Sequence, residues 1–355
     1  MEKSYLIRSA DYLKMGIEIL EQVGVSAAHA AILMENFLDC DRKGIFTHGI
    51  FRLPTYLKQM KRGNINPQPD IRIVKDDPAV VLMDGDAGLG AVVSYYAMQA
   101  AIDICSRQGI GVVGVRNSNH FGAAAYYTEM ASRANYIGIA FTNASPAIAP
   151  TGSLQPLLGN NPWSISVPTN LPYPITMDIA NSVVARGKIR IAKSKGESIP
   201  LGWALNRYGQ PTTDPQEALD GGAILPIGDY KGYCITFMLE ILTGVLTGAA
   251  FGDQIAGVEQ DGIRNNGHLF IALDIEKFMS VEEFKRRVDE LVRMVKSLPR
   301  IKEDQEILLP GEIEWRRKLS QAEGTVKLTE QIFQMLHELS TEYGVNLPEI
   351  QVVGA

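Results

Sequence analysis

Cysteine is scarce in this 355-residue sequence, and its spacing gives no sign of a metal site or a disulfide framework. The three cysteines, Cys40, Cys105 and Cys234, lie far apart and form no Cys-x-x-Cys pair. Residues 1–20 carry polar side chains throughout and lack the uninterrupted apolar core of a secretory signal. Both features predict a reducing, cytoplasmic environment.

Blocks of basic residues and uninterrupted membrane-length apolar runs are also missing. The net charge is −6 at pH 7, with no interleaved basic and aromatic pattern, so we expect no nucleic-acid partner. An acidic protein repels anions at long range, so a site for an acid needs local positive charge. The longest apolar stretch, residues 233–251, contains Glu240 together with threonine and glycine near its middle. It predicts a helix buried inside a soluble fold and not a membrane span.

Most of the short motifs that mark nucleotide, hydrolase or metal sites are absent. The sequence has no P-loop, GxSxG, HExxH or EF-hand pattern, but it has one GxGxxG pattern at residues 109–114. In a dinucleotide fingerprint these glycines follow a strand and open a helix. Here a predicted helix precedes them and β-branched residues lie among them, so we expect the start of a buried strand in which glycine eases packing.

The predicted secondary structure is helical at both ends of the chain and alternating in the middle. Residues 9–42 are expected to be helical, with Ser9 and Ser26 as N-caps, followed by a helix over residues 51–61. The tail returns to helix over residues 280–296, which open with a capping box, and over residues 327–343.

The middle of the chain predicts an α/β fold. Strands are expected over residues 71–74, 79–83, 110–115, 137–142 and 163–167, and helices over residues 92–108 and 123–134. Alternation of this kind is typical of an α/β sheet. We expect residues 76–279 to form the α/β core, flanked by a mainly helical domain made from residues 1–75 and 280–355.

The first candidate site is the turn Thr47-His48-Gly49 together with Arg52. A histidine beside a hydroxyl can act as a general acid near neutral pH, and the glycine allows a ligand to approach the backbone. Arg52 follows four residues later and can bind a carboxylate through two hydrogen bonds. The alternative is an ordinary surface histidine and arginine.

The second candidate site follows the predicted strand over residues 110–115. Residues 117–124 read Asn-Ser-Asn-His-Phe-Gly-Ala-Ala and lead into a helix whose free amides could bind an anion. Open α/β sheets place ligands at such strand ends. Asp178 could accept hydrogen bonds from a ligand, and Lys231 could neutralise a phosphate. The alternatives are a capped turn and solvated surface charges.

Taken in order, these segments resemble the malate/L-lactate dehydrogenase family of NAD(P)-dependent oxidoreductases, which is distinct from the Rossmann-type enzymes of similar name. The resemblance runs from about residue 27 to residue 311. The matching segments are Arg42-Lys43-Gly44-Ile45-Phe46-Thr47-His48-Gly49, Arg52, Asn117-Ser118-Asn119-His120-Phe121-Gly122, Gly159-Asn160-Asn161-Pro162, Met177-Asp178-Ile179-Ala180, Pro211-Thr212-Thr213-Asp214-Pro215, Lys231-Gly232-Tyr233 and Leu309-Pro310-Gly311-Glu312.

This resemblance implies a non-Rossmann α/β fold, a homodimer whose site lies near the subunit interface, and hydride transfer between a nicotinamide and a small 2-hydroxy or 2-oxo acid. His48 is the implied proton donor with Thr47 beside it, although some members assign that role to the position of His120. Arg52 is the implied carboxylate anchor, with Asn160 near the substrate. The implied cofactor contacts are His120, Phe121, Gly122, Ala123, Ala124, Ala144, Asp178, Ile179, Ala180, Lys231, Gly311, Glu312 and Ile313.

Departures from the family pattern separate its branches. Thr47 stands where serine is common, and Asn160 replaces the usual threonine. Lys188 stands where cyclic-imine reductases carry an aspartate, which favours the hydroxy-acid branch. Ureidoglycolate dehydrogenase and diketogulonate reductase remain alternatives within the family. NAD is expected over NADP because only Arg186 and Arg190 offer charge for a 2′-phosphate.

A different class remains open, namely a ligand-binding protein or a metal-dependent hydrolase built around His48, His120 and His268. None of the five histidines lies four residues from another, which speaks against a histidine metal site.

Overall fold

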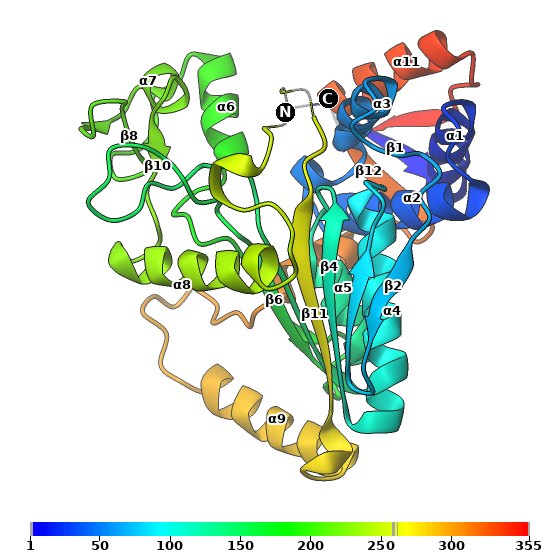
Figure 1. The fold of residues 1–355 in the computed structure, drawn as a ribbon, viewed down its shortest axis with the longest axis vertical. Helices are drawn as coiled ribbons and strands as arrows, with labels where there is room; N and C mark the ends of the chain where they lie inside the picture. Colours follow the sequence, from blue (N-terminus) through cyan, green and yellow to red (C-terminus); the bar gives the residue numbers. More distant parts are fainter. Residues whose placement is uncertain (1–2, 258–259, 261, 354–355) are drawn as a thin grey trace.

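The computed structural model, which describes residues 3–257, 260 and 262–353, is built around one mixed seven-stranded sheet (Figure 1). The strand order is β2-β3-β4-β11-β5-β6-β7. The strands are β2 (Arg72–Asp76), β3 (Val80–Asp84), β4 (Ile110–Ser118), β5 (Tyr136–Thr142), β6 (Trp163–Val167), β7 (Ile175–Ile179) and β11 (Asn266–Asp274).

The strand directions bring four loops to one edge of this sheet. β3 and β4 are parallel, and β11 is antiparallel to both β4 and β5. β6 is antiparallel to β5 and to β7. The carboxyl ends of β3, β4, β5 and β7 therefore point the same way. Loops that follow parallel strands meet at such an edge, which is where α/β folds place ligands.

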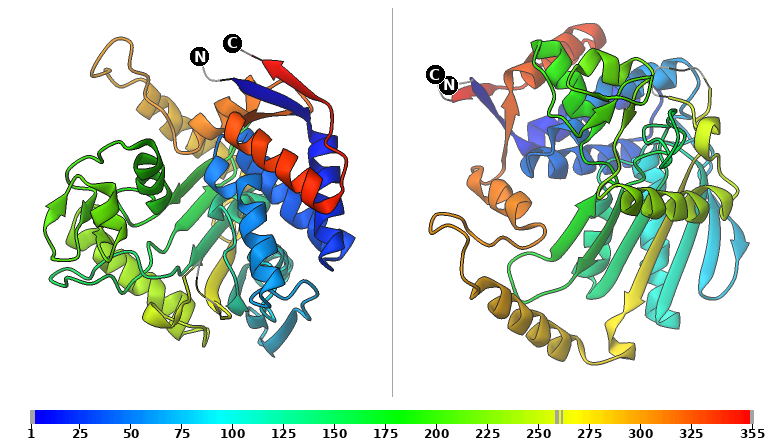
Figure 2. Two further views of the ribbon diagram at one scale, coloured as in Figure 1. Left: turned by 90° about the horizontal axis from the view of Figure 1, so that it is seen from above. Right: turned by 90° about the vertical axis from the view of Figure 1, so that its left-hand side faces the viewer.

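Helices cover the two faces of the sheet unequally. The helices α4 (Gly90–Gln108) and α5 (Ala124–Arg133) pack on one face, with Val93, Tyr127 and Phe270 fully enclosed between the layers. α8 (Tyr230–Glu240) continues into a π-helical turn, η3 (Ile241–Val245), and the two cross the other face (Figures 1 and 2).

The prediction for the GxGxxG segment is confirmed. Gly109 ends α4 in the left-handed region, with φ of +83°, and the chain then enters β4. A Cβ at Gly111 would lie 2.0 Å from the Ala101 carbonyl oxygen, so glycine is needed for close packing of α4 on the strand.

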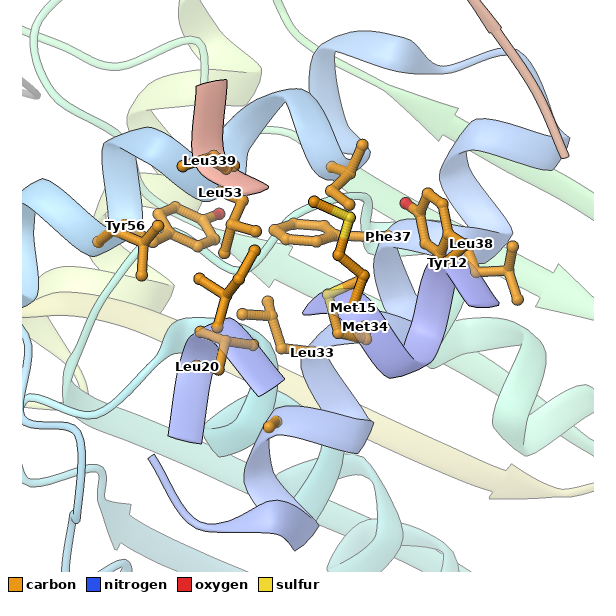
Figure 3. Packing of buried hydrophobic residues seen from close by; sticks show 14 of the residues in the cluster. Tyr12, Met15, Leu20, Leu33, Met34, Phe37, Leu38, Leu53, Tyr56 and Leu339 are labelled. Atoms are coloured by element: carbon orange, nitrogen blue, oxygen red, sulfur yellow. The ribbon is translucent and has the colours of Figure 1, made fainter. Parts of the chain in front are cut away.

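The two ends of the chain share a second core. The helices α1 (Ser9–Gln22), α2 (Ala27–Arg42), α3 (Leu53–Lys61) and α11 (Glu330–Tyr343) surround it. Phe37 lies between Tyr12 and Tyr56 in this core, with Leu33 and Leu53 beside it (Figure 3). Burial of each such side chain contributes about 1.5–3 kcal/mol.

A small sheet joins the ends of the chain directly. β1 (Ser4–Arg8) lies between β12 (Thr325–Thr329) and β13 (Ile350–Val353), antiparallel to both.

The observed architecture matches the predicted fold class, a non-Rossmann mixed-sheet core flanked by helices from both chain ends. The predicted domain boundaries stay a prediction. α9 (Val281–Lys296) lies at the end of the large sheet remote from α1 and α11 (Figure 1).

Three local predictions were wrong. Ser9 is not an N-cap, because residues 4–8 pair as β1 and Arg8 takes that position without a side-chain cap. The predicted helix over residues 327–343 begins only at Glu330, since Val326 and Leu328 alternate inward in β12. The apolar stretch 233–251 is helical but buried on one face only, leaving Phe237, Met238, Val245 and Leu246 exposed.

The predicted caps at Ser26 and Ser280 are confirmed, with each hydroxyl oxygen accepting from the backbone N–H three residues on.

A third, smaller unit follows β7. It contains α6 (Arg186–Lys195), α7 (Pro215–Leu219) and a sheet of β8 (Ala204–Leu205), β9 (Pro211–Thr212) and β10 (Ala223–Ile224). The remaining elements are η1 (Phe46–His48), η2 (Ile50–Arg52), η4 (Gly252–Gln254), η5 (Ile275–Lys277) and α10 (Glu312–Ser320). Among the described residues, no helix has the length and apolar character needed to cross a bilayer.

Candidate active site

The turn that carries His48 and Arg52 is held by its own hydrogen bonds. α2 ends at Arg42, and two 3-10 turns, η1 and η2, lead from there into α3. Thr47 Oγ1 lies 3.0 Å from His48 Nδ1, and Arg52 Nε donates to the Thr47 carbonyl oxygen at 2.7 Å. The turn therefore fixes the imidazole and the guanidinium relative to each other.

The second histidine reaches the same place from the edge of the large sheet. His120 lies in the loop between β4 and α5, and its ring stacks on that of His48 with centroids 5.6 Å apart. Tyr56 Oη, on α3, lies 2.7 Å from His120 Nδ1. The structure thus brings together both predicted acid/base candidates, one from each part of the fold.

A small pocket opens beside this pair. Its lining comprises Arg52, Thr55, Tyr56, Gln59, Ile65, Asn119, His120 and Arg264. His120 is part of this wall, whereas His48 is not. Arg264 Nε donates to the Ala256 carbonyl oxygen at 3.0 Å. Within the described part of the chain, no hydrogen bond engages the terminal nitrogens of Arg52 or Arg264.

Sequence reasoning missed Tyr56 and Arg264. Tyr56 had a usable signal, since it follows Arg52 by four residues and lies on the same face of α3. Arg264 had none, because only the pairing of β11 with β4 brings its loop beside residues 119 and 120.

The charges around the pocket favour an anion. Burial lowers the pKa of His48 to about 4, with the Arg52 charge acting in the same direction. Burial also lowers the pKa of His120, and Arg52, His48 and Arg264 add to this effect. Burial raises the pKa of Tyr56 to about 12. At neutral pH the imidazoles and phenol are uncharged, and the two guanidiniums make the pocket positive.

His268 lies beneath the His120 loop and not in the pocket. Its Nδ1 is 2.7 Å from Thr142 Oγ1, its Nε2 is 2.9 Å from Ser118 Oγ, and its ring stacks on Phe121. Both nitrogens therefore have hydroxyl partners. Among the described residues, no group of three or more histidine, cysteine or acidic side chains is placed so that it could hold a metal ion. Because both of its ring nitrogens are engaged, His268 does not complete the three-histidine metal site that the sequence left open.

The residues expected to contact a cofactor gather along the sheet edge next to this pocket. Gly122, Ala123 and Ala124 lead into α5, where the Ala125 amide donates to Asp178 Oδ2 at 2.8 Å. The predicted anion site at this helix start is thus partly filled by the protein's own carboxylate. Asp178 is near the end of β7, with Ile179 and Ala180 directly after it.

Two further predicted site residues, Ala144 for the cofactor and Asn160 for the substrate, lie next to Asn161. Its Oδ1 accepts from the Ala144 amide at 3.0 Å, and its Nδ2 donates to Glu240 Oε2 at 2.5 Å. The Asn160 carbonyl accepts from the Asn181 amide, so this residue lies beside Asn181 and outside the pocket wall.

Lys231 is exposed at the start of α8. The glycine after it packs close to Asn181, because a Cβ at Gly232 would lie 2.9 Å from the Asn181 carbonyl oxygen. Lys231 precedes Gly232 and Ala180 precedes Asn181, so Lys231 lies near Ala180.

The segment before α10 lies alongside β7, where the Thr176 amide donates to the Pro310 carbonyl oxygen at 3.2 Å. Gly311 has φ of +83°, and a Cβ there would lie 3.2 Å from the Thr176 carbonyl oxygen of β7. The Glu312 carboxylate pairs with Lys296 and Arg316, each at 2.6 Å, so its side chain already has partners. Ile313 is exposed beside it.

Comparison with known proteins identifies the family. The family model described as malate/L-lactate dehydrogenase matches residues 7–337. The chain belongs to the malate/L-lactate dehydrogenase family. This result confirms the resemblance seen in the sequence and the prediction of a 2-hydroxy acid dehydrogenase at that general level.

Individual family members match over almost their whole lengths. The L-sulfolactate dehydrogenase of Methanocaldococcus jannaschii is 43% identical, with 97% of this chain and 99% of that protein covered. The malate/(S)-sulfolactate dehydrogenase of Methanothermus fervidus is 42% identical, with 93% and 96% covered. The structure of malate dehydrogenase from Entamoeba histolytica superposes with a TM-score of 0.92 at 30% identity, covering 97% of this chain and 99% of that one.

Proposed function

We propose that the chain interconverts a 2-hydroxy acid and a 2-oxo acid that carries a second anionic group, of the malate or sulfolactate type, with NAD(P) as hydride carrier. The observation that carries this proposal is the second guanidinium in the pocket. Arg52 and Arg264 line the same small space as His120, and the terminal nitrogens of both are without partners among the described residues. Two positive groups fit two anionic groups, and the relatives named for malate and sulfolactate act on such acids.

Each pocket residue then has a distinct task. Arg52, held through Nε by the turn, binds the carboxylate next to the reacting carbon. Arg264 binds the second anion, a carboxylate or a sulfonate. Tyr56 orients His120, since its hydroxyl can donate to or accept from Nδ1.

The stacked pair of His48 and His120 provides the group that exchanges a proton with the substrate oxygen. The sequence favoured His48 as donor and kept His120 as the alternative. The pocket wall supports His120, whose Nδ1 is engaged by Tyr56 and whose Nε2 is the nitrogen left to meet a substrate oxygen. His48, with Thr47 on its Nδ1, lies against the other side of the His120 ring.

The cofactor assignment is part of the same proposal. A nicotinamide supplies or accepts the hydride at the substrate carbon. The residues proposed to hold it are those of the sheet edge, from His120 to Ala124, Ala144, Asp178 to Ala180 and Lys231, together with the backbone of Gly311 to Ile313 next to β7. These residues fit the group, because Asp178 Oδ1 has no partner among the described residues and can accept from a hydroxyl.

NAD is the cofactor proposed here in preference to NADP, for the reason given by the sequence. Arg186 donates through Nη1 to the Pro146 carbonyl oxygen at 3.4 Å, which places it beside the loop of Ala144. Burial and the neighbouring Arg190 lower the pKa of Arg186. A 2′-phosphate would relieve that repulsion, so NADP stays the alternative.

A homodimer is proposed from the apolar surface of α8 and η3. Met238 is 53% exposed and Leu246 is 65% exposed, and Phe237, Val245 and Phe251 extend the same surface. Exposed apolar areas of this kind mark interaction sites. A second copy of this chain is the occupant that the family resemblance implies.

The experiment that tests the proposed function is a comparison of 2-oxo acids. With NADH and NADPH in turn, oxaloacetate and 3-sulfopyruvate should give higher kcat/KM than pyruvate or glyoxylate. Arg264→Gln should lower kcat/KM for the dianions by about 10- to 100-fold, the equivalent of one charged hydrogen bond, and leave pyruvate nearly unchanged. Arg293→Gln, on the exposed surface of α9, is the matched control. Equal losses for pyruvate and oxaloacetate would remove Arg264 from substrate recognition.

A further inference from the structure

A buried carboxylate lies directly under the turn that carries His48 and Arg52. Asp41, in the last turn of α2, is fully buried. Its Oδ2 accepts from Tyr12 Oη at 2.6 Å and from the Ile50 amide at 3.0 Å. Its Oδ1 is buried without a partner among the described residues.

The turn is shaped around this carboxylate. A Cβ at Gly49 would lie 1.8 Å from Asp41 Oδ1, so residue 49 rests on the carboxyl group with no room for a side chain. Gly49 has a negative φ of −86°, so its requirement here is space and not backbone conformation. Asp41 thus touches the backbone of the two residues that follow His48.

We propose that Asp41 is a positioning residue, which fixes the His48–Arg52 turn against α1 and α2 through the Ile50 amide, with Tyr12 holding its carboxyl group in place. The inference rests on the proposed function, because it assigns this geometry to substrate binding and proton transfer. Asp41 does not line the pocket, so it acts through the residues that do.

The cost of burying the Asp41 carboxyl group supports a role for this residue beyond stability. Burial raises the pKa of Asp41 to about 7, against the hydrogen bonds from Tyr12 and Ile50, which lower it. A buried carboxyl group with one unpaired oxygen destabilises a core. The same group holds the Ile50 amide in one position, because a buried amide without a hydrogen-bond partner is itself costly.

The test compares two substitutions at one position. Asp41→Asn keeps an oxygen for both donors, whereas Asp41→Ala removes it. The measurements use the purified full-length protein in its native oligomeric state. Asp41→Ala should lower kcat with oxaloacetate by about 10- to 100-fold and raise the KM for oxaloacetate, because small misplacements of catalytic groups have effects of this size. Asp41→Asn should restore kcat to within about threefold of the wild type, and NADH affinity by fluorescence titration should be unchanged in both.

Two further variants separate positioning from loss of stability. Ser132→Ala removes a buried hydroxyl pair with Ser166, remote from the pocket, and should lower the melting temperature without changing kcat. Tyr12→Phe keeps the shape of the core and removes one bond to Asp41, and should lower kcat by a few-fold. It also serves as the test if Asp41→Ala does not fold.

Two readouts keep the inference separate from the proposed function. Hydrogen exchange at the Ile50 amide should be faster in Asp41→Ala and Tyr12→Phe than in the wild type, whatever the substrate is. A wild type inactive on every 2-oxo acid would refute the proposed function alone. Folded Asp41→Ala with wild-type kcat and wild-type Ile50 exchange, or equal losses in Asp41→Ala and Asp41→Asn, would overturn the positioning role.

Discussion

The two histidines owe their chemical state to what surrounds them. Each has its Nδ1 next to a hydroxyl, Thr47 for His48 and Tyr56 for His120, and each faces the Arg52 charge. Burial together with that charge keeps both imidazoles neutral. A neutral imidazole is ready to take a proton when a 2-hydroxy acid is oxidised.

Substitution of the two histidines should separate their roles. His120→Asn should lower kcat by about a hundred- to ten-thousandfold, the usual size of general acid–base assistance. His48→Ala should have a smaller effect on kcat and leave NADH affinity nearly intact. Steady-state rates with the preferred acid and cofactor titrations measure both. Should His48→Ala carry the large loss and His120→Asn stay active, the roles must be exchanged.

The depressed pKa values also predict a pH profile. The pKa of His48 lies near 4 and that of His120 is lowered as well, so neither base is protonated until the pH falls well below the ordinary value of 6.5. In the oxidative direction, kcat/KM should therefore stay flat from pH 8 to about pH 5.5. A rate profile that halves near pH 6.5 in the wild type and in Asp41→Asn alike would contradict the assignment of a histidine with a lowered pKa as the essential base.

At the scale of elements, the sequence predicted the pieces that have strong local signals. The strands and helices from residue 71 to residue 167 follow from apolar periodicity and were found with small shifts at their ends. β1, β12 and β13 are short and pair across the length of the chain, so no local pattern distinguishes them from helix ends. The N-cap predicted at Ser9 is wrong for this reason. The N-caps predicted at Ser26 and Ser280 are confirmed, because the geometry of a cap depends only on residues close in sequence.

The exposed side of α8 and η3 should decide the oligomeric state. Leu246→Glu should convert a dimer into a monomer, because a charge buried without a partner in an apolar interface is strongly unfavourable. Light scattering coupled to size exclusion measures the mass. Leu291→Glu, at an exposed apolar position on α9, is the control and should leave the mass unchanged. A wild type that is monomeric at micromolar concentration would contradict the dimer.

At the scale of the whole molecule, the site joins segments that only the fold brings together. His48 and Arg52 stood out through their local turn, and His120 through its place after a strand. Their contact with each other, and the position of Arg264 beside them, depend on sheet pairing and on packing of the helical ends against the sheet edge. Those distances follow from tertiary structure and are not encoded in spacing.

The stability of the whole fold should depend on pH through Asp41. Its pKa is raised to about 7 from an ordinary value of 3.8, so between these values the folded chain holds a proton that the unfolded chain has released. The contribution of this group to the free energy of unfolding therefore falls as pH rises through that window, by up to about 1.4 kcal/mol per pH unit.

Comparison with Asp41→Asn isolates that contribution. His48 and His268 have lowered pKa values, so they give the opposite slope, but they do so equally in both proteins. In urea unfolding, the wild type should lose stability relative to Asp41→Asn between about pH 4 and pH 7, and the difference should level off above that range. Parallel curves at all pH values would show that the carboxyl group does not titrate in this range.

The pairing of β1 between β12 and β13 sets an order in which the molecule can be completed during synthesis. A ribosome that has released the first sixty residues has already made His48, Arg52 and Tyr56, yet the strand preceding them still has both edges open. Only when residues 325–353 emerge do those edges close, so a segment made late finishes the support of residues made much earlier.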